Sequence, residues 1–87
     1  MTHDEFEIAL REFARRVSGR PNVTRATPLF DGLIDSIRVL DLIAFVQTTL
    51  GIRIPDAMIR HENFRNVRAI AGAFWPLAAP ERRHAAG

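Results

Sequence analysis

The stretch that decides the fold runs from Gly32 to Gly51 and reads GLIDSIRVLDLIAFVQTTLG. Between residues 36 and 50 only two side chains carry a charge, and apolar residues cover most of a helix circumference. A helix that packs on one side needs an apolar stripe only about 100° wide. We therefore predict a helix over residues 36–50 whose core side is the line at i, i+4, i+8 spacing, Leu42, Val46 and Leu50.

This helix carries a second apolar line, formed by Ile37, Leu40 and Ala44 at i, i+3, i+7 spacing. A one-sided helix does not need this second line for its core. We expect it either to be covered by the loop that precedes the helix or to be exposed for a partner protein.

The sequence on both sides predicts three further helical segments. Thr2 and Glu5 stand at capping-box spacing and open a helix over residues 3–17, which ends at Gly19. A short helix is expected over residues 62–64. Asn66 is a good N-cap for a last helix that Pro76 closes.

A long loop over residues 19–35 joins the first two main helices. Loops of this length are uncommon in small domains unless they are functional or anchored by their own side chains. Its candidate anchors are the apolar residues near its end: Leu29, Phe30, Leu33 and Ile34. The expected fold is an all-α four-helix bundle, with three main helices and a short one, over residues 1–75, followed by a mobile tail over residues 76–87.

Composition excludes several classes of function. The chain has 87 residues, no cysteine and a net charge of +2, so disulfide scaffolds and thiol nucleophiles are absent. Acidic residues interrupt the arginines of the first helix, and the helix over residues 36–50 is apolar, whereas a DNA-reading helix needs polar and basic side chains. No apolar run reaches the length of a membrane span. We expect no nucleic-acid or membrane partner and a cytoplasmic monomer.

The sequence offers almost nothing for catalysis. His3, His61 and His84 lie far apart, and none stands at metal-ligand spacing with an acid, so we interpret them as solvated side chains. Asp31 and Asp35 lie in the loop, where turn-forming and capping roles are expected. We predict no enzymatic activity and no metal site.

Asp35 and Ser36 open the apolar helix. They are the residues best suited to a chemical role. Capping is the usual role for either residue. However, the N-terminus of a helix favours an attached phosphate, because its backbone N–H groups and dipole face that end. A serine hydroxyl exposed there, beside a surplus apolar line, is suited to covalent modification by another protein.

The segment GLIDSIRVLDLI resembles the phosphopantetheine attachment region of the acyl and peptidyl carrier proteins. The similarity continues in register over roughly residues 4–75. It includes Leu29-Phe30, Leu50, Ile52, Ile54-Pro55-Asp56, Glu62-Asn63-Phe64 and Val67-Arg68-Ala69-Ile70.

The resemblance implies a non-catalytic carrier with 4′-phosphopantetheine on Ser36, transferred from coenzyme A by a magnesium-dependent phosphopantetheinyl transferase. Asp35 would be the acidic neighbour that the transferase reads. The terminal thiol of the arm would hold an acyl or aminoacyl group as a thioester. The implied contact residues for the transferase and for the loading and processing enzymes are Ile37, Arg38, Leu40, Asp41 and Ala44.

Two departures from the pattern concern the type of carrier. Arg38 stands where fatty-acid carriers usually have an acid, and Gln47, Thr48 and Thr49 stand where they often have glutamates. The sequence is therefore more similar to discrete acyl or aminoacyl carriers of polyketide or nonribosomal-peptide pathways. The alternatives are a fatty-acid carrier, or an unmodified helical interaction module in which Ser36 is only a cap.

Overall fold

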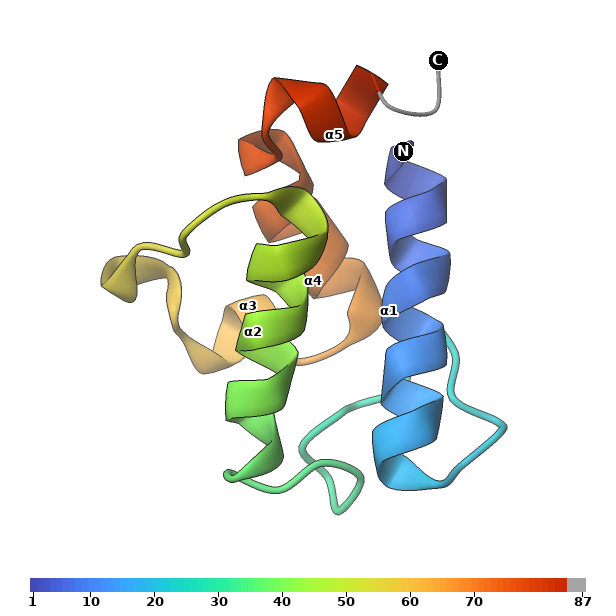
Figure 1. Cartoon of the computed structure of the whole chain (residues 1–87). Coiled ribbons are helices and arrows are strands. Elements are labelled where there is room, and N and C mark those ends of the chain that lie inside the picture. The colour runs from blue at the N-terminus through green and yellow to red at the C-terminus, as the bar shows by residue number, and fades with distance from the viewer. Residues whose placement is uncertain (85–87) are drawn as a thin grey trace.

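The computed structural model describes residues 1–84, which fold into a helical bundle without strands (Figure 1). This confirms the predicted fold class of three main helices and a short one. The structure adds two 3₁₀ turns and a short C-terminal helix. In chain order the elements are α1 (His3–Ser18), α2 (Arg38–Leu50), η1 (Asp56–Met58), α3 (His61–Phe64), α4 (Val67–Phe74), η2 (Trp75–Leu77) and α5 (Pro80–His84).

Both ends of α1 are closed as its sequence predicts. The Thr2 hydroxyl accepts a hydrogen bond from the Glu5 backbone N–H at 3.1 Å, and the Glu5 carboxylate accepts one from the Thr2 N–H at 2.8 Å. Gly19 ends the helix in the left-handed conformation, with φ of 70°. These caps satisfy backbone groups that the helix itself cannot pair.

The core lies where the main helices meet. The predicted line of α2 is confirmed, because Leu42, Val46 and Leu50 are all fully buried. Helix α4 packs on α1 and α3, while α1 and α2 run antiparallel beside each other (Figure 1). Between α1 and α2 the rings of Phe13 and Phe45 stack with centroids 4.5 Å apart. Further core residues are Phe6, Leu10, Ala14, Phe64, Val67, Ile70, Ala71 and Phe74.

The long loop between α1 and α2 is anchored by its own residues. Leu29 and Ile34 are buried, and Phe30 and Leu33 are half-buried, which confirms these candidates. The backbone N–H of Leu29 donates to the Arg65 carbonyl at 2.8 Å, so the loop is tied to the junction of α3 and α4. This attachment fixes the chain just before α2 begins.

Residues after α4 contact the rest of the bundle. Ala78 is buried, and the Ala79 backbone N–H donates to the Leu50 carbonyl at 2.9 Å. The terminal amine of Met1 donates to the Arg82 carbonyl, also at 2.9 Å, so α5 lies across the end of the bundle where α1 starts (Figure 1). The domain boundary at residue 75 and the mobility of residues 76–87 stay predictions; residues 85–87 lie outside the described part of the chain.

Candidate functional site

Helix α2 begins at Arg38, two residues later than the sequence predicts. Ser36 and Ile37 form a turn before it, and Asp35 closes that turn. One carboxylate oxygen of Asp35 accepts hydrogen bonds from the backbone N–H groups of Ile37 at 3.1 Å and Arg38 at 2.9 Å. A carboxylate at this end of a helix also interacts favourably with the helix dipole. Asp35 is therefore the residue that caps α2.

Ser36 is exposed at this turn and takes no part in the cap. No group of the described chain is hydrogen-bonded to its hydroxyl, because Asp35 accepts both of the capping N–H bonds. The other serine, Ser18, contrasts with it: the Ser18 hydroxyl donates to the Ala14 carbonyl at 2.6 Å. The Ser36 hydroxyl is thus accessible for a reaction at the start of α2.

A groove of about 380 Å³ lies beside Ser36. The loop before α2, the start of α2, the segment after η1 and α3 supply its walls. Most of its lining is apolar, with polar groups on the rim. The lining residues are Phe30, Ile34, Asp35, Ser36, Val39, Ile59, Arg60, His61 and Phe64.

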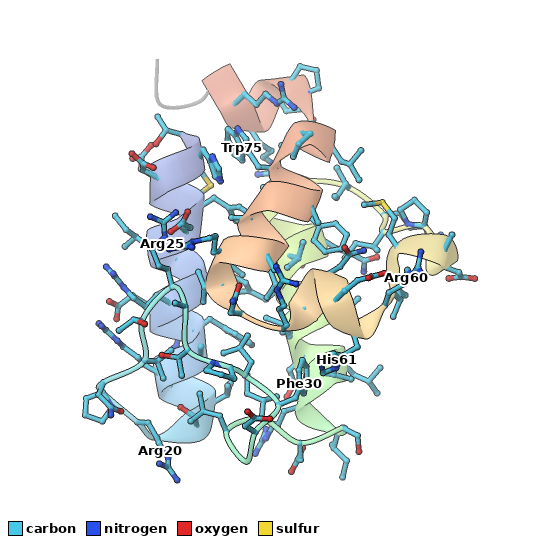
Figure 2. The ribbon with its side chains drawn as sticks, turned by 180° about the vertical axis from the view of Figure 1, so that it is seen from behind. Arg20, Arg25, Phe30, Arg60, His61 and Trp75 are labelled. Atoms are coloured by element: carbon cyan, nitrogen blue, oxygen red, sulfur yellow. The ribbon has the colours of Figure 1, made fainter. Side chains whose placement is uncertain are left out.

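The sequence does not predict that Ile59, Arg60 and His61 line this groove. Ile59, Arg60 and His61 are far from Ser36 in the sequence, and His61 was interpreted only as a solvated side chain. It is indeed exposed, but its ring lies against Phe30 of the loop, with centroids 5.8 Å apart (Figure 2). Only the three-dimensional path of the loop brings these residues together, so no local sequence signal could have revealed them.

The second apolar line of α2 is exposed rather than covered by the loop. Ile37 is 74% and Leu40 is 67% exposed, and Ala44 is also exposed. Beside them, Arg38 and Asp41 form an ion pair at 3.2 Å, with both side chains about half exposed. The five residues expected to contact partners are therefore all accessible on α2, and their role as contacts stays a prediction.

The other histidines lie away from Ser36 or outside the described part of the chain. His3 stacks on Trp75 with centroids 6.2 Å apart, at the opposite end of the bundle from His61 (Figure 2). The side chain of His84 lies outside the described part. Within residues 1–84 no cluster of acids and histidines could hold a metal ion. In the same residues, no helix has the length and apolar character needed to cross a membrane.

Comparison with protein-family models identifies the family of this chain. The family model described as a phosphopantetheine attachment site matches residues 9–74, which is more than half of the chain. The matched range contains most of α1, the whole loop, Ser36 and helices α2 to α4. No curated protein matches the chain.

Proposed function

The chain belongs to the phosphopantetheine-attachment family of carrier proteins, whose members carry a covalently attached 4′-phosphopantetheine. We propose that Ser36 is the residue to which this group is attached. The carrier would then be a discrete acyl or aminoacyl carrier of a polyketide or nonribosomal-peptide type of pathway. The single observation that carries the assignment to Ser36 is its exposed hydroxyl, left free by the Asp35 cap.

The residues around Ser36 fit this group. When bound, it supplies a terminal thiol that can hold cargo as a thioester, a function that a chain without cysteine lacks. The exposed Ser36 hydroxyl can form the phosphodiester without breaking a hydrogen bond of the described chain. As this bond forms, the pyrophosphate bond of coenzyme A would break, and adenosine 3′,5′-bisphosphate would leave. The backbone N–H groups and dipole of α2 favour a negative group at this end.

Asp35 supports the modification in a second way. Its carboxylate is held by two backbone N–H groups, so it has a fixed position beside Ser36 while remaining exposed. A fixed carboxylate gives the phosphopantetheinyl transferase a defined acidic feature to recognise.

The exposed face of α2 supports docking with an apolar centre. Ile37 and Leu40 are more exposed than any other large apolar side chains of the described chain. Arg38, paired with Asp41, adds a cation where a fatty-acid carrier would present an acid. This charge favours partner enzymes other than the basic enzymes of fatty-acid synthesis, and a fatty-acid carrier is the second candidate function.

In this role the chain carries cargo and catalyses no reaction itself, as is general for carrier domains. Coenzyme A would donate the arm, so the proposal places the chain in the cytoplasm. An unmodified interaction module with the same exposed face is the rival class.

Loading of the purified chain tests the proposal. The chain is incubated with a broad-specificity phosphopantetheinyl transferase, coenzyme A and Mg²⁺, and its intact mass is measured. We expect a gain of one phosphopantetheinyl group in the wild type, no gain in Ser36→Ala, and a normal gain in Ser18→Ala, the matched control. A wild type that gains no mass supports the interaction module, and a gain that survives in Ser36→Ala rules out Ser36.

A further inference from the structure

His61 and Ser36 both line the groove. Ser36 belongs to the turn before α2, whereas His61 is the first residue of α3. A groove of about 380 Å³ has the volume of a small-molecule site, so one ligand can contact several of its lining residues. A group attached to the Ser36 hydroxyl starts in the groove that His61 also lines.

Phe30 gives the exposed imidazole a fixed neighbour. The two rings are inclined at 47° with centroids 5.8 Å apart, and they face each other in Figure 2. Phe30 is half-buried and packs against the core, and the preceding residue, Leu29, is buried and hydrogen-bonded to the Arg65 carbonyl. An exposed side chain that lies against an anchored ring is restricted in the directions it can take.

The basic side chains near Ser36 differ in their ion pairs. Arg38 pairs with Asp41 at 3.2 Å, and Arg60 pairs with Glu62 at 2.9 Å. Within residues 1–84, His61 has no ion-pair partner. Its imidazole carries at least one N–H donor in either protonation state, and phosphate oxygens are strong acceptors. Both basic side chains of the groove lining have N–H donors for a phosphate: Arg60 uses its Nε for Glu62 and keeps its other donors, and no ion pair of the described residues involves His61.

We propose that His61 is a positioning residue for the arm. Its imidazole donates a hydrogen bond to the phosphodiester on Ser36, and Phe30 holds the imidazole in place, so the arm rests in the groove when no enzyme is bound. This inference rests on the proposed function, because it requires the modification of Ser36.

The test uses the loaded full chain, isotope-labelled in the protein and unlabelled in the arm. Isotope-filtered NOE spectra should show contacts from arm protons to the rings of Phe30 and His61. The ring of His3 at the other end of the bundle is the internal control and should show none. The ³¹P signal of the phosphodiester gives a second readout that does not depend on enzyme activity.

Two variants separate a hydrogen bond from simple packing. His61→Gln keeps an N–H donor, whereas His61→Leu keeps a similar volume without one. Loss of one such hydrogen bond should lower the equilibrium constant for docking of the arm about two- to tenfold. We expect weaker arm-to-Phe30 contacts and a shifted ³¹P signal in His61→Leu, and near wild-type values in His61→Gln.

Each result decides the question. If the loaded wild-type chain shows no contacts between the arm and the two rings, this inference is wrong and the carrier function is unaffected. The same holds if a folded His61→Leu chain keeps the wild-type contacts and ³¹P signal. If circular dichroism shows that His61→Leu does not fold, the contacts in the wild type and the His61→Gln spectra decide. A chain that gains no mass on incubation with the transferase overturns both proposals.

Discussion

Asp35 and Ser36 are neighbours with different tasks at the start of α2. The carboxylate of Asp35 accepts the hydrogen bonds that close the helix end, so the hydroxyl of Ser36 is left without an intramolecular partner. A modification of Ser36 therefore does not remove the cap of α2. The sequence predicts that one of these two residues caps the helix, but it cannot say which, since aspartate and serine are both good caps.

The cap leads to a prediction on stability. Asp35→Ala should lower the free energy of unfolding by about 0.5–2 kcal/mol, because the N–H groups of Ile37 and Arg38 lose their acceptor. Asp35→Asn keeps an acceptor oxygen and should lose much less. Urea denaturation followed by circular dichroism measures both.

Asp31 provides the control for this series. It is exposed in the same loop and makes no capping bond, so Asp31→Ala should change the stability by at most about 0.5 kcal/mol. Equal losses in Asp31→Ala and Asp35→Ala would contradict the capping role.

At the scale of the element, α2 has a core side and an accessible side. Helical spacing alone predicts its core side correctly, because Leu42, Val46 and Leu50 recur at every fourth residue and are buried. Spacing could not decide whether the second apolar line was covered, since that depends on the path of the loop. The structure shows that the loop leaves Ile37 and Leu40 exposed.

Two neighbouring leucines of α2 test this division. Leu40→Asp places a charge at a position that is 67% exposed. The free energy of unfolding of this variant should therefore change by at most about 0.5 kcal/mol. Its loading by the transferase should slow about fivefold or more, because an apolar contact at the centre of an interface contributes at least about 1 kcal/mol. Circular dichroism and the initial rate of mass gain are the measurements.

Leu42→Asp is the matched variant on the other side. Leu42 is only 1% exposed, and an unpaired carboxylate in the core should prevent folding. A Leu40→Asp chain that also fails to fold would place Leu40 in the core, and one that loads at the wild-type rate would remove Leu40 from the transferase contact.

At the scale of the molecule, contacts between distant backbone segments decide what the sequence could not. Periodicity correctly indicates the main helices, and the apolar residues near the end of the loop are anchors as predicted. It cannot indicate that Leu29 donates to the Arg65 carbonyl or that Phe30 lies against His61, because neither contact has a local pattern. Phe30 and His61 both line the groove beside Ser36, so the sequence indicates Ser36 as a candidate site but not the residues that lie across the groove from the loop.

The residues after η2 give a prediction for the whole bundle. Truncation after Leu77 removes the buried Ala78 and the hydrogen bonds of Ala79 and Arg82. A loss of about 1 kcal/mol corresponds to a melting temperature lower by about 4–8 °C in a domain of this size. Differential scanning calorimetry measures the change.

A chain truncated after residue 84 keeps all of these contacts and is the control. It should melt with the full-length chain. If the truncation after Leu77 also melts within about 1 °C of the full-length chain, residues 78–87 behave as the mobile tail that the sequence predicts.

The hydrogen bond from the Met1 amine to the Arg82 carbonyl has a consequence for how this bundle can be used as a module. It brings residues 1 and 82 to the same end of the molecule, whereas α2 begins at the other end (Figure 1). A unit whose entry and exit points are adjacent can be inserted into a surface loop of another protein without stretching either chain. In such a fusion the host would hold the bundle by one end, and the start of α2 would face away from it.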